Sequence, residues 1–219
     1  MEAKLKTTSI LLFIMTTIWV VLTVISMSGT DPGWSDGDYV VWVADPDIYF
    51  SLNYINVTLL TLIVMLLYLY LFNYLKALNR RLALAVLLLV PVYGALNLFS
   101  YSIQIFLVPG LAHAALEQQG DLTHVSTLVQ ANSNSMVGLL NGIAYAVLGI
   151  PSIVYGFLLF RSYRKYSGIF LLLNGVLCLV GLLGYLTDLS LLSMGVMVGG
   201  IFFLISLLFM AIEFKRNLT

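Results

Sequence analysis

Apolar residues fill long stretches of this chain, and short polar segments separate them. Six stretches are long enough to cross the hydrocarbon core of a bilayer, which a helix spans with roughly 20 residues. They cover residues 8–27, 52–75, 82–108, 133–160, 167–186 and 193–212. The pattern therefore predicts an all-α integral membrane protein in which one six-helix transmembrane domain occupies residues 1–219.

The last two stretches are separated only by the weakly polar letters TDLSLL. One helix over residues 167–212 would be about 70 Å long at about 1.5 Å per residue, more than twice the thickness of the hydrocarbon core. We therefore expect the chain to turn back near Thr187 and Asp188.

Composition favours a lipid environment over water. Hydrophobic residues make up 61% of the chain and charged residues 9%, whereas a soluble domain carries about 25% charged residues. The formal net charge of zero argues against nucleic acid as a partner, because such proteins carry a basic surface. The single cysteine, Cys178, cannot form an internal disulfide.

The positions of the charges predict the orientation of the helices. Every Lys and Arg lies before the first stretch, between the second and third, between the fourth and fifth, or after the sixth. These residues are Lys4, Lys6, Lys76, Arg80, Arg81, Arg161, Arg164, Lys165, Lys215 and Arg216. The alternate loops, residues 28–51, 109–132 and 187–192, hold acids without Lys or Arg. The positive-inside rule then places both termini in the cytoplasm.

The N-terminus has a second interpretation. Lys4 and Lys6, followed by an apolar run and the letters SMSG, also fit a cleaved signal peptide. The run from Ile10 to Ile25 exceeds the usual signal-peptide core and contains Trp19, so we favour a retained first helix. Cleavage would leave five spans.

The predicted spans contain neutral polar side chains and have no ionisable residue near their centres. Proton relays and ion-coupled carriers normally keep an ionisable group there, so those classes are disfavoured. The residues that we assign to a candidate ligand pocket are Asn53, Asn56, Asn97, Tyr101, Gln104, Asn134, Asn141 and Tyr145.

Helical spacing sorts most of these residues onto two stripes, at i, i+4, i+7 on the third span and at i, i+7, i+11 on the fourth. The stripes are Asn97, Tyr101 and Gln104, and Asn134, Asn141 and Tyr145. An amide in hydrocarbon needs a hydrogen-bond partner, so we expect the stripes to face each other or water in the outer half of the membrane. Either interhelical hydrogen bonds or a pocket for a small neutral molecule or lipid headgroup would explain them.

The loop at residues 109–132 holds both histidines. On one continuous helix, the side chains of His113, Glu117, Asp121 and His124 would share a face and match a zinc ligand set. Gly120 interrupts that face, so we predict one helix over residues 110–119 and a solvated loop rather than a metal site. The letters DLTH are predicted to cap the fourth span. In the first outer loop, the letters DYVVWVA predict a short strand.

Glycines four residues apart allow helices to approach closely. Gly195 and Gly199 in the sixth span predict such packing within the chain, and a homo-oligomer through them is the alternative.

Three segments carry a resemblance. They are residues 70–109, residues 149–186 with the letters GIPSIVYGFLLFRSYRKYSGIFLLLNGVLCLVGLLGYL, and residues 199–216. In the spacing of their apolar residues, and in the short arginine-containing hairpin after the fourth span, these segments resemble a large family of bacterial and archaeal multi-pass membrane proteins. That family is known only as a domain of unknown function. The resemblance implies a prokaryotic plasma membrane and assigns no activity.

Three classes of function remain. We favour a non-enzymatic binding or regulatory protein that holds a small molecule or lipid in a polar pocket in the outer half of the helix bundle. The alternatives are a facilitator of a neutral solute and an extracytoplasmic metal-dependent hydrolase that uses His113 and His124. The sequence contains no nucleophile elbow and no HExxH motif, so we assign neither catalytic residues nor a cofactor. The expected partners are membrane lipids and a small neutral ligand.

Overall fold

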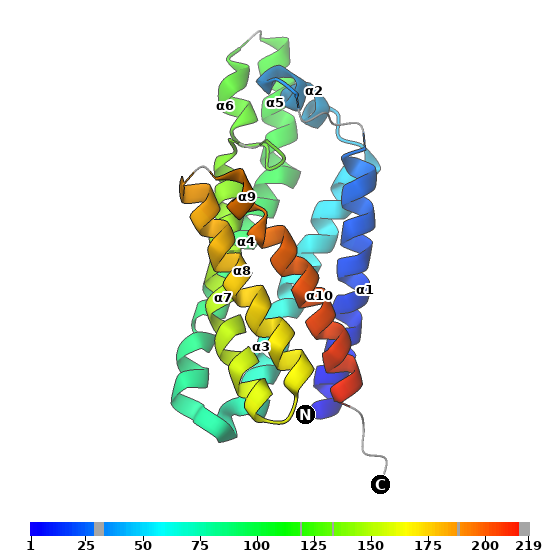
Figure 1. Cartoon of the computed structure of the whole chain (residues 1–219). Helices are drawn as coiled ribbons and strands as arrows, with labels where there is room; N and C mark the ends of the chain where they lie inside the picture. The colour runs from blue at the N-terminus through cyan, green and yellow to red at the C-terminus, as the bar shows by residue number, and fades with distance from the viewer. Residues whose placement is uncertain (29–32, 119, 133, 188, 215–219) are drawn as a thin grey trace. The chain divides into compact units, whose positions relative to one another are not determined.

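The computed structural model describes residues 1–28, 33–118, 120–132, 134–187 and 189–214 (Figure 1). The helices are α1 (Glu2–Ser26), α2 (Asp36–Ala44), α3 (Ile48–Leu87), α4 (Leu89–Ser102), the π-helix η1 (Ile103–Leu107), α5 (Val108–Glu117), α6 (Leu122–Ser126), α7 (Met136–Arg161), α8 (Lys165–Thr187), α9 (Ser190–Ser193) and α10 (Gly195–Glu213). The described residues contain no strand, which confirms the all-α class. Asp31, Asp188, Lys215 and Arg216 lie outside them.

Within these ranges, five helical segments are long and apolar enough to cross a membrane. This confirms the prediction of a helical protein with several segments that are long and apolar enough to span a membrane. The chain groups into two compact units, each of which is described by itself. Unit 1 holds Met1–Thr16, Leu60–Ala95 and Gly142–Thr219, and unit 2 holds Thr17–Leu59 and Leu96–Asn141.

The longest apolar segment, Ile48–Glu117, is interrupted at Asn79. This residue has extended backbone angles, φ −158° and ψ 91°, inside α3. Its side chain accepts a hydrogen bond from the backbone N–H of Leu82 at 3.1 Å and so caps the helix that restarts there. Gly94 packs against the side chain of Met65, whereas a straight helix would hold these residues roughly 40 Å apart. The chain therefore folds back at Asn79.

The segment predicted as a strand, DYVVWVA, is helical and belongs to α2. The prediction was wrong because Ser35 and Asp38 form a capping box, which starts a helix. The carboxylate of Asp38 accepts the backbone N–H of Ser35 at 2.7 Å, and the hydroxyl of Ser35 also donates to it. These bonds, the one from the Ser35 side chain first, lower the pKa of Asp38. Val40 and Val43 then face the core of unit 2.

Asp121 caps a helix, but not the predicted one. Its carboxylate accepts the N–H of Thr123 at 2.9 Å and starts the short helix α6. The prediction that DLTH caps the fourth span was wrong, because turns follow α6 and the hydroxyl of Ser135 caps α7 by accepting the N–H of Gly138 at 3.0 Å. The predicted helix break around Gly120 is confirmed, since α5 ends at Glu117.

Glycines bring helices of unit 1 into backbone contact. A Cβ added to Gly156 of α7 would lie 2.6 Å from the backbone nitrogen of Leu172 and 2.7 Å from the carbonyl oxygen of Gly168, both in α8. In α10, Gly195 and Gly199 face α8 of the same chain in a similar way. This confirms the predicted close packing within the chain, and the homo-oligomer stays a prediction.

We predict that Gly156→Ala destabilises the protein whereas Gly200→Ala does not. The added methyl group of the first variant meets the α8 backbone, which cannot move aside as a flexible side chain can, and such overpacking costs about 1–3 kcal/mol. At Gly200 in α10, no described atom lies within 4 Å of an added Cβ. Alanine there gains up to about 1 kcal/mol of helix propensity. Thermal unfolding midpoints of the detergent-purified variants test this, and equal midpoints would contradict it.

Candidate functional site

Several predicted pocket residues of unit 2 have hydrogen-bond partners within the protein. Asn53 accepts a bond from the hydroxyl of Thr23 at 3.3 Å and so joins α3 to α1. Gln104, in the π-helix η1, donates to the carbonyl of Leu128 at 2.7 Å and accepts the N–H of Gln130 at 3.0 Å. Both bonds hold the turns that follow α6, so the amide of Gln104 has a structural role.

The two predicted polar stripes meet at one point. The amide nitrogen of Asn141 donates to the hydroxyl oxygen of Tyr101 at 3.5 Å, and both residues are buried. Asn134 does not continue its stripe, because α7 begins only at Met136 and leaves Asn134 exposed in a turn. Tyr145 belongs to unit 1, where its ring lies 6.0 Å from that of Tyr93.

Asn97 differs from the other buried pocket residues. Its side chain is 0% exposed, and neither its amide oxygen nor its amide nitrogen has a hydrogen-bond partner among the described residues. On the next turn of α4, the buried hydroxyl of Ser100 likewise has no partner there, and neither does the buried amide oxygen of Asn56 in α3. Each orphaned polar group costs about 1–3 kcal/mol. These atoms are therefore the strongest candidates for contacts with a ligand.

The residues of the hypothetical metal site form two separate pairs. His113 lies 3.5 Å from Glu117 on α5, and His124 lies 3.5 Å from Asp121 at the start of α6. More than half of each of these side chains is exposed. Hydrogen bonds from the backbone and then the side chain of Thr123 lower the pKa of Asp121. In the described ranges, no group of three or more His, Cys, Asp or Glu side chains could hold a metal ion.

Asp36 joins α2 to α6 and to the turns that follow α6, a role that the sequence did not reveal. One of its carboxylate oxygens accepts the hydroxyl of Ser126 at 2.7 Å and the amide of Asn132 at 3.2 Å. Asp47 similarly caps α3 by accepting the N–H of Phe50 at 2.7 Å. These aspartates thus order α2, the start of α3 and the turns after α6.

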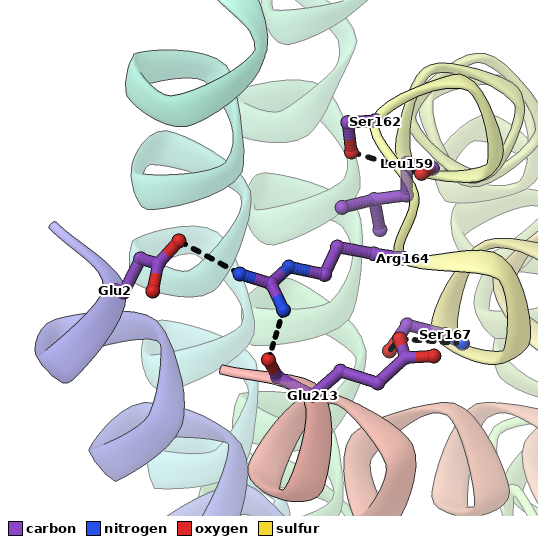
Figure 2. A network of polar contacts seen from close by, with 6 residues as sticks. All are labelled: Glu2, Leu159, Ser162, Arg164, Ser167 and Glu213. Carbon is purple, nitrogen blue, oxygen red and sulfur yellow. Dashed lines mark hydrogen bonds and ion pairs between the residues drawn. The ribbon is translucent and has the colours of Figure 1, made fainter. Parts of the chain in front are cut away.

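Arg164 is the centre of a polar network in unit 1 (Figure 2). Tyr163 ends α7 with a left-handed backbone, φ 67°, as the C′ residue of a helix often does. The guanidinium of Arg164 donates to the carboxylate of Glu2 at 2.8 Å and to the backbone carbonyl of Glu213. It also lies 4.9 Å from the ring centroid of Phe214.

The same network closes on the start of α8. The carboxylate of Glu213 accepts the N–H groups of Tyr166 and Ser167, each at 3.2 Å, and the Ser167 hydroxyl. Burial alone would lower the pKa of Arg164, but the hydrogen bonds of the Tyr74 and Glu2 side chains and the charge of Glu2 outweigh it and raise that pKa. Arg164 therefore stays charged and joins α1, α8 and α10. The sequence alone identifies Arg164 only as one of the basic residues that predict the orientation of the helices.

No family model, curated protein or solved structure matches this chain. The class of protein is therefore assigned from the helical fold and the apolar segments alone. It is an all-helical protein whose described residues include five segments long and apolar enough to span a membrane. The resemblance to the family of unknown function stays a prediction.

We predict opposite effects of leucine at two buried asparagines. Asn97→Leu removes two orphaned polar atoms and keeps the side-chain shape, so it should stabilise the protein by about 1–3 kcal/mol in the absence of ligand. Asn174 instead donates to the carbonyl of Gly199 at 3.0 Å, so Asn174→Leu should destabilise it by about 0.6 kcal/mol or more. Thermal unfolding in detergent measures both. Equal losses of stability would show that Asn97 is paired.

Proposed function

We propose that this chain is a multi-pass protein of a prokaryotic plasma membrane that binds a small neutral polar molecule at Asn97. The observation that carries the proposal is the burial of Asn97 with both amide atoms unpartnered in the described chain. Proteins rarely leave buried polar atoms without hydrogen-bond partners. A bound ligand that supplies those partners would explain why Asn97 lacks them within the chain.

The polar atoms themselves specify the chemistry of the ligand. Asn97 presents two N–H donors and an acceptor oxygen, and Ser100, on the next turn of α4, adds a hydroxyl. The sequence has no charged residue between positions 48 and 75 or between 82 and 112. A charged ligand would therefore lie in apolar surroundings without a counter-charge, at a high cost. The site thus suits a neutral molecule with both donors and acceptors, such as a primary amide or a polyol.

Binding fits these residues better than catalysis. Among the residues of unit 2 that the structure describes, the histidines and carboxylates lie in α2, α5 and α6 or at helix ends, where most of them cap helices, anchor turns or form exposed pairs. The groups around Asn97 on its own helix are amides, hydroxyls and apolar side chains. Such groups orient a neutral molecule, but at neutral pH they do not exchange protons readily.

The proposed topology has six crossings with both termini in the cytoplasm. Five apolar segments were found in the described chain, and the longest folds back at Asn79 and so supplies two crossings. The basic residues then gather on one side, as the positive-inside rule requires. The backbone contact between Gly195 and Gly181 supports the reversal between α8 and α10.

Reporter fusions test this topology. A fluorescent protein that folds only in the cytoplasm should be bright when it is fused after residue 219 or inserted after Asn79. Alkaline phosphatase, which is active only outside, should be active when it is inserted after Gly120 and inactive at the other two positions. Phosphatase activity at the C-terminus would contradict the proposed cytoplasmic position of that terminus.

Ligand-dependent stabilisation tests the site. Acetamide and glycerol serve as probes, and the measured quantity is the rise in unfolding midpoint of the wild type minus that of Asn97→Leu. A probe at about ten times its Kd should raise the wild-type midpoint by about 3–5 °C more than that of the variant. General solvent effects cancel in this difference.

The matched control is Asn73→Leu, which replaces a half-buried asparagine of α3 whose side chain bonds to its own helix. This variant should respond as the wild type does. Equal responses of wild type and Asn97→Leu to both probes would count against an amide- or polyol-binding site.

A further inference from the structure

A recess of about 250 Å³ lies in unit 1 between α3 and the end of α7. Its lining residues are Leu78, Asn79, Leu82, Phe157, Leu158 and Arg161. Four of these six side chains are apolar, one is an amide and one is a cation. The recess forms where the helix break at Asn79 separates the two parts of α3. It is distinct from the candidate site at Asn97, which belongs to unit 2.

Among the described residues that line this recess, Arg161 alone is charged. Its guanidinium carbon lies 5.6 Å from the ring centroid of Phe157, which holds the cation beside an apolar wall. Among the described carboxylates, none forms an ion pair with Arg161, whereas Arg164 nearby in the sequence is paired with Glu2. The hydrogen-bonding fork of Arg161 is therefore available, and its planar geometry suits a phosphate.

We propose that this recess binds an anionic phospholipid, with the lipid phosphate on Arg161 and the first part of an acyl chain against Leu78, Leu82 and Phe157. The volume is below the range of about 300–1,000 Å³ typical of pockets that enclose a whole ligand. It therefore suits the glycerol phosphate and a few methylene groups, while the rest of the lipid stays in the bilayer.

The surrounding charges favour the same occupant. Arg80 and Arg81 directly follow Asn79 at the edge of the recess and are exposed. Basic side chains at a membrane surface each contribute about 1 kcal/mol of attraction to anionic lipid. A soluble phosphate would gain nothing from the apolar walls, and a zwitterionic lipid would gain less from the cations. A negatively charged lipid uses both features.

The test is lipid-dependent stabilisation of the full chain in an uncharged detergent. Phosphatidylglycerol and phosphatidylcholine with identical acyl chains are added at equal mole fractions, and the unfolding midpoint yields an apparent Kd for each. Phosphatidylglycerol should bind more tightly. Arg161→Gln should weaken its binding about tenfold or more, because a charge-assisted hydrogen bond is lost.

Two further variants separate the headgroup from the acyl chain. Lys165→Gln removes an exposed cation that does not line the recess, and it should change the apparent Kd by less than about twofold. Leu82→Trp fills the apolar wall while Arg161 remains, and it should also weaken binding.

Three results would overturn the proposal. The first is equal stabilisation by the two lipids, and the second is unchanged phosphatidylglycerol affinity in Arg161→Gln or in Leu82→Trp. The third is binding of glycerol 1-phosphate alone as tightly as phosphatidylglycerol, which would identify a site for a soluble phosphate. None of these results bears on the site at Asn97.

Discussion

Apolar surroundings supply no hydrogen-bond partner, and this constraint shapes every polar group between the helices of this protein. Backbone groups satisfy it by forming helices. Side chains satisfy it across helices, as when Asn174 donates to the carbonyl of Gly199 or Tyr155 to that of Ala83. Asn97 fails to satisfy it within the described chain. Asn53, Gln104 and Asn141 all find partners within the protein, and this difference is the basis of the proposal that a ligand contacts Asn97.

Two arginines that lie three positions apart, Arg161 and Arg164, meet this constraint in different ways. The left-handed turn at Tyr163 directs Arg164 toward Glu2 and the end of α10, where its charge is neutralised and its donors are used. Arg161 still belongs to the last turn of α7 and meets Phe157 instead of a carboxylate. One arginine thus stabilises the fold of unit 1, and the other remains available at the edge of a recess. A count of basic residues treats them alike.

Sequence reasoning succeeded where one local property was sufficient. Long apolar runs predicted the helices, and the glycine at position 120 correctly indicated the end of α5. Sequence reasoning failed where short-range hydrogen bonds outweigh the intrinsic preference of a segment for strand or helix. The valine-rich stretch of α2 favours a strand by composition, but the capping box of Ser35 and Asp38 starts a helix. Asn134 was placed on a helix because its spacing fitted, although the polar turns after α6 delay the start of α7.

The sequence by itself determined the all-helical class and the apolar segments, because both depend on hydrophobicity summed over many residues. It also selected Asn97 among its candidate pocket residues, but could not rank that residue above Asn53 or Gln104. Only the tertiary structure decided which of these amides has a partner, since the partners Thr23, Leu128 and Gln130 lie on other segments of the chain. Hydrogen bonding is a pairwise and directional interaction, so its outcome depends on where distant residues meet.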